Sequence, residues 1–277
     1  MRALNRLYHP ITATPFAQDD AYTELVPCEA LRPYIRCFWG TTHPMTATAD
    51  PDAMGLVIPD TCMDVIFSVN YTANRLGGHF CTLDEHSFCT QGKEGSRDLY
   101  ATFAIRFYAW TAYLFVEEEL RGSKNKRYPI DAFFRRLQRD LAPLLFDLPS
   151  LEAKARAAED ILLHRLGQRT VHSDLLNAVH YVLSTSGRGT IREACAFTAM
   201  SPRRMERLFD AHMGLSPKSF ASLIRYQLLW QDMMHSPHFS ILDAVDKFGY
   251  TDQAHLLHDF KRRHLMSPRE AILLARK

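Results

Sequence analysis

The chain has 277 residues, which suggests about two domains, and its hydrophobic fraction of 47% is ample for buried cores. No stretch approaches about 18 uninterrupted apolar residues, so the composition excludes a membrane-spanning helix. The start, Met1-Arg-Ala-Leu-Asn5, leads into polar sequence rather than an apolar run. We therefore expect no signal peptide and a cytoplasmic protein.

Charge is distributed unevenly along the chain, although the net charge is only +2. Residues 1–170 carry 19 Lys and Arg against 21 Asp and Glu, a net of −2. Residues 171–277 carry 14 against 10, a net of +4, together with 8 of the 13 histidines. This asymmetry favours a nucleic-acid-binding C-terminal half and a different partner for the N-terminal half.

The first 107 residues are rich in predicted strands. The run 101–107 alternates with a period of two, which places Phe103, Ile105 and Phe107 on one face. Further strand-like runs cover 33–39, 55–58 and 63–67, and turns are indicated at Pro59-Asp60, Gly77-Gly78 and Gln91-Gly92. Many short strands separated by turns predict a small barrel or sandwich.

From about residue 111 the hydrophobic period becomes helical. Asp131 is predicted as the N-cap of one helix, and Ser150 as the N-cap of a second helix that ends at Gly167. Either these helices pack on the β-rich domain, or part of their surface is a dimer interface. The best domain boundary follows at 167–173, which predicts domains over residues 1–168 and 172–277.

The region 190–270 contains the same pattern twice. Three positions recur at an offset of 50 and four at an offset of 51, so one residue is inserted at the second turn. The pairs are Ile191 with Ile241, Cys195 with Val245, Ala199 with Gly249, Met205 with Leu256, Phe209 with Phe260, Ser216 with Ser267, and Pro217 with Pro268. Each copy predicts a short helix, a tight turn and a second helix, which is how many proteins read a DNA major groove. A plain all-α duplication would not explain why both copies close with Ser-Pro.

The second helix of the first copy is predicted over 201–213. At 100° per residue, Met205 and Phe209 lie on its inner face, while Arg203 and Arg207 point outward. A guanidinium fork pairs bidentately with guanine O6 and N7, so this outer face is suited to base recognition in the major groove.

The corresponding helix of the second copy is predicted over 252–264. Leu256 and Phe260 face inward, and Gln253 can pair bidentately with adenine. The basic run 261–263 is better suited to phosphates. We therefore expect the first copy to carry more of the base recognition and the second to contribute more through phosphates.

A connecting helix is predicted between the copies, with Ser216 as its cap and an end near His235. Its 19 residues span about 28 Å at 1.5 Å each. Such a helix would hold two DNA-reading helices about one turn of DNA, roughly 34 Å, apart.

The C-terminal hundred residues, about 40% of the chain, closely resemble the AraC/XylS family of bacterial transcription regulators. The segments that carry the resemblance are Ser201-Pro-Arg-Arg-Met-Glu-Arg-Leu-Phe209, Gly214-Leu-Ser-Pro-Lys218, Gly249-Tyr-Thr-Asp-Gln-Ala-His255, Phe260-Lys-Arg-Arg263 and Ser267-Pro268. It implies seven helices in two helix-turn-helix units joined by a linker helix.

The resemblance also implies roles for individual residues. Base contacts fall on Arg203, Glu206, Arg207, Gln253, Ala254, Leu257 and His258. Phosphate contacts are expected at Ser201, Arg204, Lys218, Thr251, Asp252, His255, Lys261, Arg262 and Arg263. Three positions depart from the family pattern. Ala199 and Leu265 stand where Gly is common, so each is expected to need a left-handed conformation. His258 stands where Arg is frequent, so contacts there are expected to be weaker or pH-sensitive.

The N-terminal part resembles the cupin-like sensor domain that precedes such modules in one subgroup, through the segments 36–40, 59–67 and 104–110. The overall prediction is an α+β multidomain chain with an N-terminal β-barrel and a C-terminal all-α domain. A small polar effector is expected at Arg36, Trp39, Asp60, Cys62, Asp64 and Arg106. The charged members of this set could equally form a structural ion pair at the barrel mouth.

Six cysteines are present, at positions 28, 37, 62, 81, 89 and 195, and without a secretory signal free thiols are expected. Scattered core thiols are favoured over a redox sensor, and over a metal site because no Cys-x-x-Cys or His-x-His pair exists. No cofactor is expected. No nucleophile elbow, P-loop or dinucleotide motif points to an enzyme.

The sequence thus predicts an effector-controlled transcription regulator. Its expected partners are double-stranded DNA, a small-molecule effector, a second copy of the chain and RNA polymerase. Two alternatives remain open: a cupin-type enzyme with an appended DNA-binding module, and a constitutive DNA-binding protein without an effector.

Overall fold

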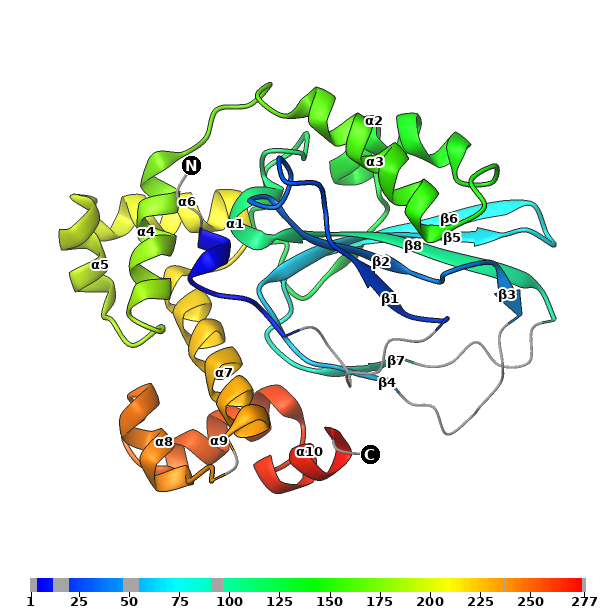
Figure 1. The fold of residues 1–277 in the computed structure, drawn as a ribbon. Helices are drawn as coiled ribbons and strands as arrows, with labels where there is room; N and C mark the ends of the chain where they lie inside the picture. Colours follow the sequence, from blue (N-terminus) through cyan, green and yellow to red (C-terminus); the bar gives the residue numbers. More distant parts are fainter. Residues whose placement is uncertain (1–3, 12–19, 47–54, 91–96, 237, 276–277) are drawn as a thin grey trace.

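The computed structural model describes residues 4–11, 20–46, 55–90, 97–236 and 238–275. A β-rich part with two long helices over one side is followed by an all-helical part (Figure 1). This arrangement confirms the α+β prediction. No helix within these described ranges is both long and apolar enough to cross a membrane.

The β-rich part consists of two antiparallel sheets. The main sheet has the strand order β1-β2-β8-β5-β6-β9, with β3 also paired to β8, and the small sheet pairs β4 with β7. The strands are β1 (Thr23–Leu25), β2 (Ile35–Gly40), β3 (Met45–Thr46), β4 (Gly55–Val57), β5 (Cys62–Asn70), β6 (Arg75–Cys81), β7 (Phe88–Thr90), β8 (Leu99–Tyr108) and β9 (Arg127–Tyr128).

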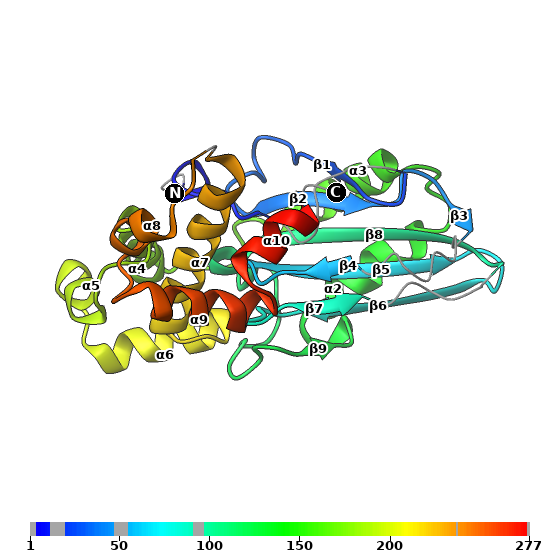
Figure 2. The ribbon, with the colours of Figure 1, turned by 90° about the horizontal axis from the view of Figure 1, so that it is seen from below.

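The predicted barrel does not close among the described residues. The end strands β1 and β9 of the main sheet do not pair with each other, and the small sheet pairs with neither. Instead, α2 and α3 cover one face of the main sheet, and β4 and β7 lie over the opposite face (Figures 1 and 2). Both faces of the sheet are therefore covered without closure of the sheet on itself.

The alternation in β8 explains how the two faces differ. Phe103, Ile105 and Phe107 are fully buried in the core beneath the two helices, as the period of two predicts. Arg106 points to the opposite face, where β8 pairs it with Asp64 of β5. Strand β8 thus contributes an apolar side to the core and a polar side to the space between the main sheet and the small β4–β7 sheet.

The glycines 77 and 78 do not form the predicted turn, because both lie inside β6. The turn between β5 and β6 occurs at residues 71–74, where Asn74 adopts φ 49°. A Cβ on Gly78 would lie 2.3 Å from the carbonyl oxygen of Ile66 and 2.7 Å from Cδ1 of Ile130. Glycine is therefore required by close packing against the neighbouring strand, not by a turn. The Gln91-Gly92 turn lies outside the described residues.

The helices of the N-terminal part are η1 (Leu4–Arg6), α1 (Ala109–Ala112), α2 (Asp131–Leu141), η2 (Ala142–Leu144) and α3 (Leu151–Arg165), the η elements being 3-10 helices. Ser150 caps α3 as predicted, since its side chain accepts a hydrogen bond from the Ala153 amide. Asp131 is the first helical residue rather than the N-cap, which is Ile130 and makes no side-chain cap.

The C-terminal part contains seven helices between residues 173 and 275. They are α4 (Ser173–Ser184), α5 (Ile191–Thr198), α6 (Pro202–Met213), α7 (Pro217–His235), α8 (Ile241–Phe248), α9 (Gln253–His264) and α10 (Pro268–Ala275). Ser216 caps α7 as predicted. Ser201 and Asp252, where the second helices of the two copies were predicted to begin, cap α6 and α9, and all three side chains accept a backbone hydrogen bond. Ala199 and Leu265 adopt the expected left-handed conformation, at φ 52° and 64°.

The long helix α7 contributes to two separate hydrophobic cores. Phe220 and Ile224 belong to a core that joins the first helix-turn-helix unit to the β-rich part. Tyr226 and Trp230 belong to a core formed with the second unit, and Leu56 of β4 packs into this second core as well. Both units are therefore packed against the N-terminal part as well as against α7.

Candidate DNA-binding surface and effector cavity

The first helix-turn-helix unit exposes a polar face on α6. Met205 and Phe209 are buried, as predicted, whereas Arg203, Glu206 and Arg207 are exposed to solvent. The start of the helix is stabilised by Ser201, whose hydroxyl oxygen accepts a hydrogen bond from the Arg204 amide at 3.3 Å. The side chains expected to read bases thus project from a capped helix start.

The second unit exposes a different face on α9. The Asp252 carboxylate accepts a hydrogen bond from the His255 amide at 2.7 Å and caps the helix. Gln253, Ala254 and His258 are exposed. Leu257, which is also expected at bases, is only partly exposed and packs against the second core.

The residues expected at phosphates do not all face solvent. Most are exposed: Arg204, Lys218, Thr251, Asp252, His255, Lys261, Arg262 and Ser201. Arg204 forms an ion pair with Asp174 of α4. Arg263 is the exception, because it is 1% exposed, pairs with Asp259 and donates to the Ser222 hydroxyl at 2.8 Å. Its position at the same helical face as Leu256 and Phe260 accounts for this burial, so in this conformation it is not available to a phosphate.

The C-terminal ends of α6 and α9 both contact the N-terminal part. The Leu120 amide donates to the Ala211 carbonyl at 2.9 Å, next to an Arg121–Asp210 ion pair at 2.9 Å. At α9, the Ser87 amide donates to the Arg263 carbonyl at 2.7 Å. Figure 1 shows α6 by one end of α7 and α9 by the other. The N-terminal part therefore holds the C-terminal ends of both α6 and α9, while their N-terminal ends are exposed.

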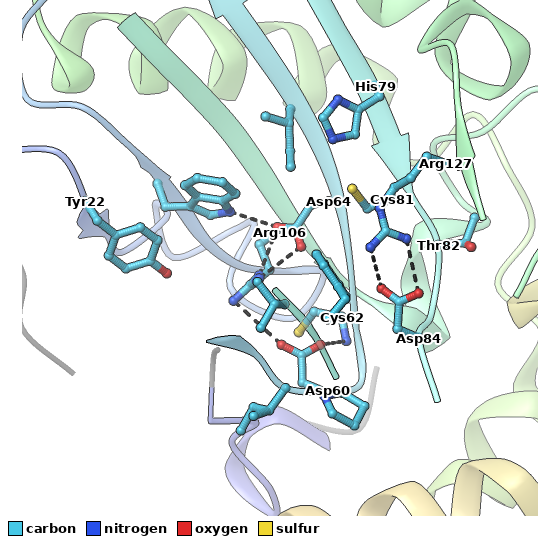
Figure 3. Close-up of a pocket in the computed structure, with 16 residues that line it drawn as sticks. Tyr22, Asp60, Cys62, Asp64, His79, Cys81, Thr82, Asp84, Arg106 and Arg127 are labelled. Carbon is cyan, nitrogen blue, oxygen red and sulfur yellow. Dashed lines mark hydrogen bonds and ion pairs between the residues drawn. The ribbon is translucent and has the colours of Figure 1, made fainter. Parts of the chain in front are cut away.

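A cavity of about 390 Å³ lies between the main sheet and the small β4–β7 sheet (Figure 3). Its wall includes five of the six predicted effector residues: Trp39, Asp60, Cys62, Asp64 and Arg106. Arg36 does not line it and lies 3.5 Å from Glu24 in an ion pair. The volume is in the range of small-molecule sites.

The charged residues expected either to bind an effector or to form a structural ion pair line the cavity and are also paired with one another. Arg106 donates from Nε and Nη2 to the two oxygens of Asp64, at 2.9 and 3.0 Å. The Trp39 indole also donates to Asp64, at 2.8 Å. Burial alone lowers the pKa of Arg106, but Asp64 and Asp60 outweigh it and raise that pKa. The guanidinium is therefore a permanent charge in the cavity wall.

Asp60 is less fully paired than Asp64. One of its oxygens accepts a hydrogen bond from the Cys62 amide at 2.7 Å. The other oxygen lies 3.6 Å from Nη1 of Arg106, beyond ordinary hydrogen-bond length. Because burial outweighs the nearby Arg106, the pKa of Asp60 is raised to about 6. The carboxylate is ionised at neutral pH and keeps one oxygen with unused accepting capacity.

Several residues that line the cavity were not predicted from the sequence. They are Tyr22, Val57, Ile58, Pro59, Ile66, His79, Thr82, Asp84, Phe88, Arg127 and Cys81. His79 and Cys81 could have been found from the alternation of β6, because they flank the fully buried Phe80 and so point to the opposite face of the sheet. Nothing local marks Asp84 and Arg127, which form a two-hydrogen-bond pair at 3.1 and 2.7 Å across 43 positions of the chain.

The cysteines of the cavity are neutral thiols. All six cysteines of the chain are free. Burial raises the pKa of Cys81 to about 12 and raises that of Cys62 as well. Since the thiolate is the reactive form, these two residues do not fit a redox sensor. Among the described residues, no group of three or more His, Cys, Asp or Glu side chains is arranged to hold a metal ion.

Strand β4 and the residues after it form a wall shared by the cavity and the C-terminal part. Val57 lines the cavity, whereas its neighbour Leu56 is buried in the second core. The Pro59 carbonyl accepts a hydrogen bond at 2.7 Å from the amide of Gln227 on α7. The oxygen of the same Gln227 side chain accepts from the Ile11 amide at 2.9 Å. The wall of the cavity is therefore in direct contact with α7.

The family comparison agrees with the geometry of the C-terminal part. Residues 194–272 match a family model described as a helix-turn-helix domain. The C-terminal part of the chain therefore carries a helix-turn-helix domain of AraC type. Residues 23–129 match a second family model, described as a domain of unknown function (DUF6597).

No curated protein matches the chain. Similar solved structures include ToxT from Vibrio cholerae, at 11% identity and a TM-score of 0.41, covering 86% of this chain and 98% of that one. ToxT bound to an unsaturated fatty acid, from strain SCE256, gives 9% identity and 0.41, covering 86% and 95%. ToxT bound to (E)-4-(8-methylnaphthalen-1-yl)but-3-enoic acid gives 12% and 0.36, covering 86% and 99%.

Proposed function

We propose that this chain is an AraC-family transcription regulator, which binds DNA under the control of a small molecule held in the cavity between the main sheet and the β4–β7 sheet. Residues 1–168 would be the sensor domain and residues 172–277 the DNA-binding domain. The observation that carries the proposal is the shared wall: Val57 lines the cavity, Leu56 packs with the second helix-turn-helix unit, and Pro59 is hydrogen-bonded to α7.

The effector would control DNA binding if the shared wall, β4 and the residues after it, had two conformations and the effector bound one of them more tightly. An effector that fills the cavity better in one arrangement shifts the population toward it. Since β4 contacts α7 and the second unit, this shift changes how α6 and α9 are presented to DNA. The coupling is reciprocal, so DNA binding would change the affinity for the effector by the same factor.

The two reading faces differ in chemistry, so each unit is proposed to recognise a different half-sequence. Arg203 and Arg207 on α6 suit guanine, and Gln253 on α9 suits adenine. A single chain would then bind two unlike half-sites in tandem rather than a palindrome. A homodimer, supported by the exposed leucines Leu144 and Leu163 on the helices of the sensor domain, would double this arrangement. Contact with RNA polymerase stays a prediction.

The DNA-binding assignment is tested by Arg207→Ala, with Arg156→Ala as the control, because Arg156 is an exposed arginine on α3 of the other domain. Once an operator is selected from random DNA, Arg207→Ala should weaken binding by about 1–3 kcal/mol and relax the preference at one base pair. Arg156→Ala should leave affinity unchanged. If Arg207→Ala weakens binding equally for all sequences, Arg207 contacts a phosphate instead.

The effector assignment is tested by filling the cavity from its wall. Val57→Trp places a large side chain in the cavity from the strand that also contacts the second unit. We expect the variant to bind operator DNA with an altered affinity and to lose its response to small molecules. If the parent chain and the variant bind DNA with equal affinity and neither responds to a small molecule, a constitutive DNA-binding protein is favoured. Turnover of a bound molecule would favour the appended-enzyme alternative.

A further inference from the structure

The ionised groups that line the cavity do not balance. Three carboxylates, Asp60, Asp64 and Asp84, face two guanidiniums, Arg106 and Arg127. The remaining titratable lining groups add no positive charge near neutral pH, because burial lowers the pKa of His79 and raises those of the two thiols and of Tyr22. The cavity therefore carries one net negative charge.

Both guanidiniums are paired with a carboxylate of the protein, although Nη1 of Arg106, 3.6 Å from Asp60, has no hydrogen-bond partner among the described residues. Arg106 makes two hydrogen bonds to Asp64, and Arg127 makes two to Asp84. A ligand carboxylate that accepted a hydrogen bond from Nη1 of Arg106 would lie beside Asp60, whose oxygen is 3.6 Å from that nitrogen. It would add a second negative charge to a cavity that already carries one, and two carboxylates in such contact disfavour each other's ionised form.

Asp60 is the carboxylate with unused capacity. It is 8% exposed, and one of its oxygens has Arg106 at 3.6 Å as its nearest charged partner. Figure 3 shows Asp60 at one end of the cavity, with its carboxylate directed toward Arg106 and Cys62. A donor carrying a positive charge would complete the hydrogen bonding of this carboxylate and neutralise the cavity.

The aromatic lining suits the body of such a ligand. The rings of Tyr22 and Trp39 lie 5.4 Å apart at the end of the cavity near Asp64. On another side, Phe88 already stacks with the Arg127 guanidinium at 4.6 Å. Aromatic faces attract cations in addition to burying apolar surface.

We propose that the cavity binds an organic cation, a protonated amine on an aromatic or aliphatic body, with its ammonium group beside Asp60. This proposal rests on the proposed effector function and specifies the ligand class for the same cavity. Binding at Asp60 would also bear on the adjacent Pro59, whose carbonyl is hydrogen-bonded to α7.

The test compares three probes of nearly equal shape on the full chain: 2-phenylethylamine, 2-phenylethanol and phenylacetate. Their affinities are measured by calorimetry at pH 7.5, with thermal shift as a second readout. We expect the amine to bind about tenfold more tightly than the alcohol, as a charged hydrogen bond implies, and phenylacetate to bind most weakly. An amine that binds no better than the alcohol overturns the proposal.

Asp60→Asn provides the matched variant, because the amide oxygen can still accept from the Cys62 amide while the charge is removed. The amine preference should disappear in this variant, with the affinity for 2-phenylethanol unchanged. If the variant does not fold, the unmodified chain is titrated between pH 7.5 and 5. The ratio of amine to alcohol affinity should then fall as Asp60 takes up a proton around pH 6.

The groups that bear on Asp60 in this titration are Arg106 on β8, Asp64 and Cys62 on β5, Asp84 after β6, Tyr8 of the N-terminal segment and Tyr226 on α7. A preference for amine that persists in Asp60→Asn, or a ratio that is constant with pH, contradicts the proposal. If phenylacetate instead binds and changes operator affinity, the ligand class is wrong and the proposed effector function stands. If an amine binds without any change in operator affinity, the ligand class stands and the effector function is wrong.

Discussion

Ala199→Gly should stabilise the protein, although the substitution removes a methyl group. Ala199 ends α5 in the left-handed conformation, at φ 52° and ψ 31°, and its side chain is exposed. The left-handed conformation costs a non-glycine residue about 1–2 kcal/mol, whereas glycine adopts it freely. Against this gain stands the greater entropy that glycine has in the unfolded chain, about 0.4–1 kcal/mol. The difference is a net stabilisation of about 0.5–1 kcal/mol.

Ala196→Gly is the matched control for this prediction. Ala196 is also exposed and lies in the same helix three residues earlier, but inside the helical region. Glycine at an exposed helical position costs about 1 kcal/mol relative to alanine. The same chemical change is therefore expected to have opposite signs at two positions of one short helix.

The assay is urea unfolding followed by circular dichroism, with thermal melting as a second measurement. The two variants should differ by about 1.5–2 kcal/mol in free energy of unfolding, with Ala199→Gly above the parent chain and Ala196→Gly below it. Destabilisation by Ala199→Gly of the same size as that by Ala196→Gly would refute the argument, because the turn would then carry no left-handed strain.

Two further predictions concern acid stability and the contact between the two parts of the chain. Burial lowers the pKa of His264 to about 4 from 6.5, so the stability it contributes is present above pH 6.5 and lost as pH falls toward 4. Unfolding at pH 7.5 and 5 should show a loss of about 2 kcal/mol from this residue, and His264→Gln should remove that part of the pH dependence. Gln227→Leu would leave the Pro59 carbonyl and the Ile11 amide without their side-chain partner, at a cost of about 2–4 kcal/mol, and should abolish any effector response in DNA-binding assays. Gln231→Leu, which removes one hydrogen bond from the same helix, should cost less; equal losses in the two variants would argue against a special role for Gln227.

Short-range signals gave the most accurate predictions. Ser201 and Ser216 stand at the starts of the helices that were predicted to begin there, and the apolar positions at helical spacing are the buried ones. These signals act within one or two helical turns, so they can be recognised without knowledge of the rest of the fold. The left-handed turns at Ala199 and Leu265 were expected from the family resemblance instead, because both residues stand where glycine is common.

Strand pairing was harder to predict than strand position. The alternation in β8 placed Phe103 and Arg106 on opposite faces, but it did not reveal which strand lies next to it. Gly78 illustrates the difficulty, because its close neighbour Ile130 is 52 positions away in the sequence. A glycine required by a distant contact cannot be distinguished locally from a glycine required by a turn.

The sequence by itself determined that this chain carries two helix-turn-helix units with unlike reading faces, because helical period and capping are local properties. Only the tertiary structure decided that Arg263 is buried, that the cavity carries an excess carboxylate, and that β4 is shared between the cavity and the second unit. These features depend on groups such as Pro59 and Gln227, which lie 168 positions apart in the sequence. Such distant groups meet only after the sheet, the two cores and α7 have packed together.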